Sequence, residues 1–232
     1  MRVAHVITRL IVGGAQENTV ATLFGLHRKA DVTVRLYSGP TTGPEGSLES
    51  GVRDIEGLLH LIPSLIRPVH PLRDFLAYCH LVREFKNFRP DIVHTHSGKA
   101  GLIGRLAAKR AGVPLIIHSI HGPSFGPFQG RIANALFSEA ERFAGSRTDH
   151  FITVANAMRD QYLAAGIGSR EDYTQIFSGF PLEPYLATEN APSIRKKLGL
   201  LNDDFVVGKI ARLFELKGHE DLFAVAPRLA KR

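Results

Sequence analysis

The stretch that most constrains the fold covers residues 89–122, which read as a strand, a helix and a second strand. The first apolar run, at residues 91–94, follows a proline, and residues 100–111 have a helical pattern that ends at Gly112. Residues 113–120 are nearly all apolar, as in a parallel strand that is buried on both faces. A parallel sheet with covering helices is therefore predicted.

The same alternation of strands and helices continues along the chain. Strands are expected at residues 2–7, 31–37, 58–62, 91–94, 113–120, 151–154 and 173–177, with helices at 15–28, 71–88, 100–111, 128–143 and 156–165. Alternating elements of this kind predict an α/β fold with a doubly wound parallel sheet.

A change of composition near residue 181 predicts a domain boundary. Residues 1–180 form the first expected domain, and residues 181–192 are polar and proline-bearing, as in a linker. Residues 193–232 begin a second unit, with a helix at 193–198, a strand at 205–211 and a helix from residue 218. One strand and two helices cannot bury a core, so we expect either a truncated second domain or an end piece that packs onto the first.

Composition limits the class of protein. One cysteine among 232 residues excludes an internal disulfide, and Cys79 is expected in the core because it lies in a helical pattern. No apolar run reaches about 18 residues, and a buried first strand explains the N-terminus better than a signal peptide, so we expect a cytoplasmic protein. The net charge of +7 favours phosphate-bearing partners or an anionic membrane, whereas scattered basic residues without tryptophan argue against nucleic acid.

Polar residues follow the fourth and fifth expected strands, where ligands bind in open α/β sheets. His94, His96 and His121 could form a metal site, but no carboxylate or thiol completes a motif, so we expect no metal. His94 and His118 are expected to be structural. Lys99 opens a helix, where a cation is unfavourable, so it either meets an anion or is solvated.

Two further segments indicate anion binding. Gly13 and Gly14 lie between a strand and a helix, where free backbone N–H groups attract phosphate, although a plain tight turn explains them nearly as well. The three-glycine spacing of a dinucleotide fingerprint is missing. Arg212 and Lys217 flank the turn after the strand at residues 205–211 and could clamp a diphosphate; a surface pair of Arg212 with Glu215 is the alternative.

Together these segments resemble the family-four GT-B glycosyltransferases. Gly-Gly-Ala-Gln at residues 13–16 is similar to that family's Gly-Gly-Ala-Glu turn, with Gln16 in place of Glu. Residues 91–101 and 116–122 resemble its fourth and fifth strands, and residues 151–160 and 176–185 resemble segments near its domain crossover. Ser-Gly-Phe-Pro at residues 178–181 departs from the pattern, and residues 209–218 resemble the first strand and turn of its second domain.

The resemblance implies two Rossmann-like domains and transfer of a sugar, with retention, from a nucleotide diphospho-sugar to a glycan, glycolipid or small acceptor. It implies no cofactor and no metal, because cations neutralise the leaving diphosphate. His121 would act at the reacting sugar. Arg212, Lys217, Gly13 and Gly14 would hold the donor diphosphate, and His96, Lys99, Gly122 and Gln16 would line the acceptor side of the cleft.

The family's two donor-binding glutamates would lie beyond Arg232, so we expect this chain alone to be inactive. Two other functions stay open: a GT-B nucleotide-sugar 2-epimerase, and a non-catalytic module that binds an acceptor. A carboxylate pair in the first domain would favour the epimerase, but the candidates show no such pairing: Asp31, Glu45, Asp91 and Glu139.

Residues 58–89 combine an apolar stripe with six basic residues just inside or beside it. The simpler interpretation is an amphipathic helix with a solvated basic face. The functional interpretation is peripheral contact with an anionic membrane, on the inner face, near the acceptor side of the cleft. The stripe contains Leu59, Leu61, Ile62, Leu65, Ile66, Leu72, Phe75 and Leu76.

Overall fold

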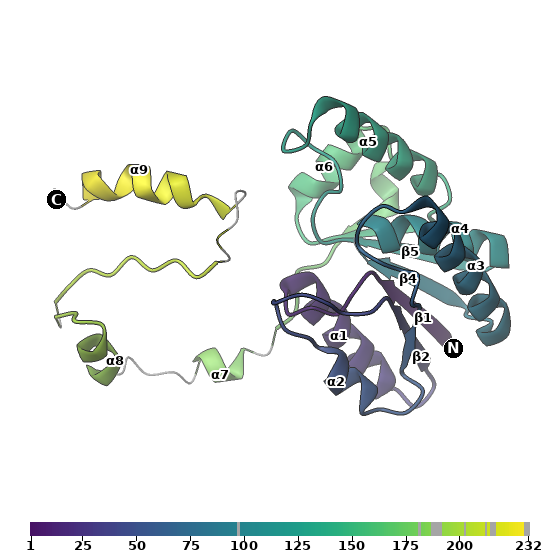
Figure 1. Ribbon diagram of the computed structural model, residues 1–232, viewed down its shortest axis with the longest axis horizontal. Coiled ribbons are helices and arrows are strands. Elements are labelled where there is room, and N and C mark those ends of the chain that lie inside the picture. Colours follow the sequence, from purple (N-terminus) through teal and green to yellow (C-terminus); the bar gives the residue numbers. More distant parts are fainter. Residues whose placement is uncertain are drawn as a thin grey trace. The chain divides into compact units, whose positions relative to one another are not determined.

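The computed structural model describes residues 1–96, 98–180, 182–186, 192–201, 203–211, 213 and 217–229 (Figure 1). The chain divides into two units, Met1–Phe180 and Pro181–Arg232. The first unit contains a sheet of seven strands in the order β3-β2-β1-β4-β5-β6-β7, and every neighbouring pair is parallel. The predicted α/β fold with a doubly wound parallel sheet is confirmed. The strands are β1 (Arg2–Ile7), β2 (Thr33–Ser38), β3 (Leu59–Leu61), β4 (Ile92–His96), β5 (Leu115–Ile120), β6 (His150–Thr153) and β7 (Tyr173–Gln175).

The direction in which strands are added reverses between β1 and β4. The chain first builds outward from β1 to β2 and β3, and then returns to place β4 on the other side of β1. The crossover helices leave a crevice at such a switch point, outside the carboxyl ends of the two strands, which is where α/β sheets bind ligands.

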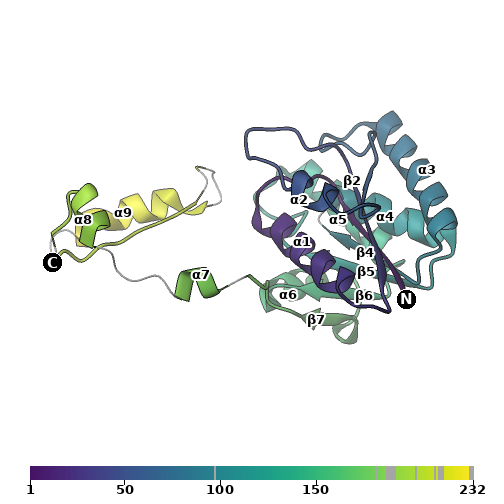
Figure 2. The ribbon, with the colours of Figure 1, turned by 90° about the horizontal axis from the view of Figure 1, so that it is seen from below.

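The two faces of the sheet have separate cores, and Figures 1 and 2 show the helices that cover the two faces. On one face, Val3 and Ile7 of β1 pack against α1 (Gly14–His27) and α2 (Glu49–Arg53). On the other face, Ala4 and Val6 pack against α3 (Pro71–Phe88) and α4 (Gly98–Ala111). The alternation of side chains along a strand therefore explains why successive residues of β1, such as Val3 and Ala4 or Val6 and Ile7, are both apolar. Beyond β5 lie α5 (Arg131–Gly145), α6 (Asn156–Ala164) and the 3₁₀ turn Arg170–Asp172.

Helix α3 buries a different stripe from the one that its apolar residues predict. Its buried side chains are Ala77, Leu81, Phe85 and Phe88. This face leaves Cys79, two positions from Ala77 and from Leu81, on the exposed side, so its predicted place in the core is wrong. The helix ends at Arg89, whose φ of 51° is the left-handed conformation that glycine usually supplies at this position.

The second unit contains α7 (Glu183–Leu186), α8 (Pro192–Lys197) and α9 (His219–Leu229). The strand expected at residues 205–211 is absent from this part of the described chain. A strand is defined by ladder hydrogen bonds to a neighbour, and β-forming residues alone do not supply that neighbour. Consistent with this, Phe205 is 93% exposed. None of the described helices combines the length and the apolarity that crossing a bilayer would require.

Candidate functional site

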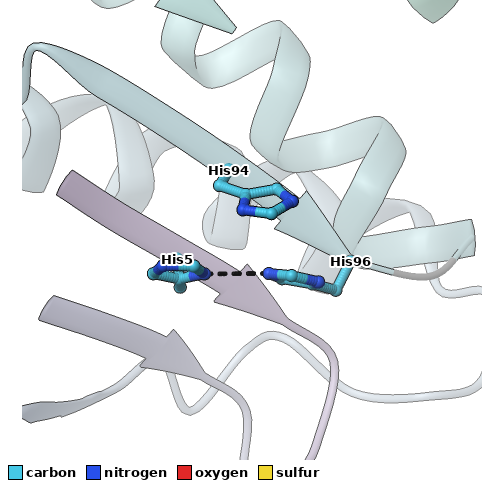
Figure 3. A group of neighbouring side chains, drawn as sticks. All are labelled: His5, His94 and His96. Carbon is cyan, nitrogen blue, oxygen red and sulfur yellow. Dashed lines mark hydrogen bonds between the residues drawn. The ribbon is translucent and has the colours of Figure 1, made fainter. Parts of the chain in front are cut away.

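The candidate site lies at the carboxyl ends of β1, β4 and β5, beside the switch point. The register pairs His5 of β1 with His94 of β4 and pairs His96 of β4 with Ser119 of β5. His94 and His96 are two residues apart on one strand, so their side chains point to the same face, and the register places His5 on that face as well. Figure 3 shows the three imidazoles side by side on β1 and β4.

A chain of hydrogen bonds joins the buried imidazoles to the edge of the sheet. His5 Nδ1 lies 2.9 Å from His96 Nε2, and His96 Nδ1 lies 3.1 Å from His121 Nε2. His94 Nε2 lies 2.7 Å from the hydroxyl of Ser119. His5 and His96 are buried, whereas His121, which directly follows β5, is half-buried. His121 is thus the imidazole nearest the protein surface in this series of hydrogen-bonded rings.

Burial keeps these rings neutral. Desolvation lowers the pKa of both His5 and His121 from 6.5 to about 4. Desolvation also holds the pKa of His94 and of His96 well below the usual value, and each is lowered further by the neighbouring histidines. At neutral pH every ring therefore offers one N–H donor and one lone pair.

The opposite face of the same strands holds His118 in a structural position. Its Nδ1 lies 2.8 Å from the Thr95 hydroxyl, and its ring packs closely against Gly101 of α4. The burial of His118 and its bond to Thr95 agree with the expectation that this ring is structural.

Two of the residues expected to line the cleft are engaged within the first unit. His96 is 1% exposed and lies behind His121 rather than on the surface. Lys99 does meet an anion, but that anion is Asp74 of α3, and its ammonium group also donates to the carbonyl of Pro68. The sequence alone could not predict these partners, because α3 and the start of α4 come together only when the protein folds.

The turn after β1 leaves the start of α1 open. Gly13 is the N-cap residue, and no side chain of the described residues caps α1 with a hydrogen bond. Gly14 is exposed, and a Cβ there would meet no atom within 4 Å, whereas a Cβ on Gly13 would lie 3.1 Å from Gln16 Oε1. Gly122, beside His121, is also exposed and equally open. These open positions match the places predicted for ligand contact, and their binding roles stay predictions.

A buried ion pair that the sequence did not suggest supports the loop after β5. The Arg105 guanidinium on α4 donates to Glu141 Oε2 on α5 over 2.6 Å, and the Ser124 hydroxyl donates to Glu141 Oε1 over 2.8 Å. Arg105 is 0% exposed. A charged residue in a helix rich in basic residues normally indicates a solvated face, so no sequence signal pointed to it.

The predicted diphosphate clamp belongs to the second unit. Arg212 lies outside the described residues. Lys217 is exposed, just before α9. Both assignments stay predictions.

Comparison with known proteins gives this arrangement a family. The sequence model of Glycosyltransferase Family 4 matches residues 12–183. The chain is 28% identical over 221 residues to the UDP-Gal:alpha-D-GlcNAc-diphosphoundecaprenol alpha-1,3-galactosyltransferase of Escherichia coli, covering 94% of this chain and 55% of the relative. It is 31% identical over 167 residues to the UDP-N-acetylglucosamine--N-acetylmuramyl-(pentapeptide) pyrophosphoryl-undecaprenol N-acetylglucosamine transferase of Shewanella amazonensis, covering 68% of this chain and 44% of the relative. The chain spans about half the length of these relatives.

Solved structures show the same fold. A glycosyltransferase from Rickettsia africae aligns with a TM-score of 0.67 at 17% identity, over 100% of this chain and 58% of that one. The UDP-GlcNAc 2-epimerase of Methanocaldococcus jannaschii aligns with a TM-score of 0.55 at 10% identity, over 76% of this chain and 45% of that one. The seven-stranded sheet thus has the Rossmann-like form of GT-B proteins. Since the family model covers most of the chain, the protein belongs to Glycosyltransferase Family 4.

Proposed function

We propose that the first unit is the acceptor-side half of a retaining glycosyltransferase that moves a sugar from a nucleotide diphospho-sugar to a glycan or a lipid-linked acceptor. The observation that carries the proposal is the position of His121. It follows β5 directly, it is half-buried at the ligand-binding edge of the sheet, and His96 supports it from behind. The two relatives named above are transferases of diphosphoundecaprenol-type substrates, which favours an acceptor on a lipid diphosphate.

In this proposal the chain's own residues divide the work. His121 presents a neutral ring to the reacting sugar, because its pKa is lowered to about 4. Gly14 lets a diphosphate approach the uncapped start of α1, where backbone N–H groups favour an anion. Arg212 and Lys217 bind the diphosphate from the second unit and stabilise its charge as the sugar leaves.

Transfer is tested with the protein encoded by the complete reading frame that contains this chain. Labelled UDP-sugars are incubated with a GlcNAc-diphospholipid, and the anomeric configuration of the product is read by NMR. His121→Ala should reduce kcat with an unchanged circular dichroism spectrum, and Arg212→Ala or Lys217→Ala should cost roughly 10²–10³-fold in turnover. His150→Ala on β6, whose ring bonds to Thr174 away from the site, is the matched control.

Full activity in all three site variants would refute the assignment. The same assay separates the alternatives. An epimerase would interconvert the donor without an acceptor, and a binding module would hold the acceptor without turnover. Three of the four carboxylates that were candidates for an epimerase pair are engaged locally: Glu45 pairs with Arg9, Glu139 with Arg142, and Asp91 accepts from the Arg2 backbone.

We also propose that the first unit contacts an anionic membrane through the start of α3. The structure divides the predicted apolar stripe, since Ile62 and Leu65 are fully buried in the core. The exposed part, which we call the α3 patch, consists of Val69, Leu72, Phe75 and Leu76, with Arg67 and Arg73 exposed beside it. Apolar side chains flanked by cations are typical of helices that lie in the membrane interface.

Co-sedimentation with vesicles of increasing phosphatidylglycerol content tests this contact. Binding should rise with anionic lipid, fall at high salt, and drop in Phe75→Glu. An exposed apolar residue elsewhere provides the control, because Ile132 on α5 is 81% exposed. If Ile132→Glu abolishes binding and Phe75→Glu does not, the α3 patch is the wrong surface. Binding that ignores lipid charge would exclude the electrostatic mode.

A further inference from the structure

Three imidazoles lie together at the switch point of the sheet. The hydrogen bonds among the described residues do not satisfy all of their ring nitrogens. His5, His94 and His96 each place a ring nitrogen within 4.8 Å of the other two (Figure 3). The sequence suggested His121 as the third member of such a group. The register of β1 with β4 supplies His5 instead.

The outer nitrogens of two rings already have partners. His94 Nε2 bonds to Ser119 Oγ, and His96 Nδ1 bonds to His121 Nε2. Histidines that ligate a metal almost always use their second nitrogen in this way, which fixes the tautomer and the ring orientation.

The inner nitrogens are less well satisfied. His5 Nδ1 and His96 Nε2 face each other across 2.9 Å and share one proton, so only one of these two nitrogens can be the donor. The other nitrogen of the His5 ring, Nε2, is buried without a hydrogen-bond partner among the described residues; it diverges from Nδ1 and cannot face the same cation.

We propose that His5, His94 and His96 bind one divalent transition-metal cation of the Zn²⁺ type. All three ligands are imidazole nitrogens, which suit Zn²⁺, Co²⁺, Ni²⁺ and Cu²⁺, whereas Mg²⁺ and Ca²⁺ prefer oxygen. The rings are neutral in the folded state, so binding needs little loss of protons. Three protein ligands leave a fourth position for water.

The site adjoins the proposed active site without taking part in sugar transfer. Metal binding replaces the hydrogen bond between His5 and His96. A metal on His96 Nε2 requires the proton of that ring to sit on Nδ1, from which it donates to His121 Nε2. His121 then carries its own proton on Nδ1, so the bound cation selects one tautomer of that ring. Metal binding itself does not depend on the proposed function, and it can be measured without any activity.

The test uses the tag-free chain, freed of metal with EDTA and titrated with Co²⁺ and Zn²⁺. We expect one equivalent to bind, with the visible absorption of four-coordinate Co²⁺ and displacement by Zn²⁺. His5→Gln should weaken Co²⁺ binding at least 10-fold. His118→Gln, a buried ring on the opposite face of the sheet, should leave the affinity unchanged.

Two outcomes overturn the proposal. One is the absence of saturable 1:1 binding to the wild-type chain. The other is an affinity that His5→Gln and His96→Gln leave unchanged. If these variants fail to fold, long-range ¹H–¹⁵N spectra of the wild type decide the question, because Zn²⁺ must shift the imidazole nitrogens of His5, His94 and His96 and spare those of His118.

Discussion

Replacement of Arg105 by methionine should destabilise the first unit more than almost any other single change. The Arg105 guanidinium is fully buried, and it donates to the carbonyl of Gly101 over 2.8 Å and to Glu141 Oε2 over 2.6 Å. Arg105→Met leaves the Glu141 carboxylate, which is 4% exposed, without its cation. The Ser124 hydroxyl is then its remaining close partner.

The magnitude follows from the burial of both charges. Removal of one member of a buried pair typically costs about 3–5 kcal/mol, because the other charge stays desolvated and uncompensated. Glu141→Leu should cost a similar amount, because it leaves the buried Arg105 guanidinium without its carboxylate. The double variant Arg105→Met/Glu141→Leu removes both charges and should lose only about 1–2 kcal/mol, from the hydrogen bonds of Ser124 and Gly101. Against a typical total of about 5–15 kcal/mol, either single change is severe.

Urea unfolding followed by circular dichroism measures the free energy of unfolding of the wild type, the two single variants and the double variant. The exposed pair on α5 is the control, because the side chains of Arg142 and Glu139 are 43% and 70% exposed. Arg142→Met should change the free energy of unfolding by less than about 1 kcal/mol. The reasoning fails if Arg105→Met costs less than about 1 kcal/mol, or if the double variant costs the sum of the two single ones.

Three further changes test the packing around the site. Gly101→Ala should lower the free energy of unfolding by about 1–3 kcal/mol, because its Cβ would overlap the buried ring of His118; a thermal melt no lower than wild type would contradict this. Arg89→Gly should stabilise by roughly 0.5–1 kcal/mol in urea, since φ there is 51°, and a loss of stability would show that the side chain compensates for the strain. Burial lowers the pKa of His118 well below its usual value, so the unfolded state binds the proton more tightly. The resulting stability is complete above about pH 6.5 and is lost as the pH falls below it; the urea midpoint should therefore drop between about pH 7 and pH 5, and less steeply in His118→Gln.

The sequence predicted the sheet well because its central strands β1, β4 and β5 are covered on both faces. Such strands appear as short apolar runs, and the glycines and prolines between them mark the turns. The helix stripe on α3 was harder to predict, since both sides of that helix carry large apolar residues. The structure shows that the small Ala77, with Leu81 and Phe85, faces the core, while Leu72 and Phe75 stay outside. Periodicity gives the angle between residues and not the side that faces the sheet.

The prediction of a strand at residues 205–211 was wrong for a different reason. Residues 205–207 have high β propensity, but the described part of the second unit offers them no neighbouring strand. The sequence likewise gave no sign of the Lys99–Asp74 pair, because two helices must first dock before that contact exists. Propensity and spacing report local preferences, whereas partners across the fold depend on packing.

The histidines of the candidate site illustrate how much depends on register. The His-Thr-His spacing of β4 was visible in the sequence and correctly places two rings on one face. His5 belongs with them only because β1 pairs in the register that sets it opposite His94. A slip of one residue would bring Ala4 or Val6 to that position and turn His5 toward the opposite core. The apolar alternation of Val3, Ala4, Val6 and Ile7, which divides between two cores, forbids that slip. The packing of the sheet therefore fixes the geometry of its polar cluster, and core residues of β1 determine which nitrogen lies beside His96.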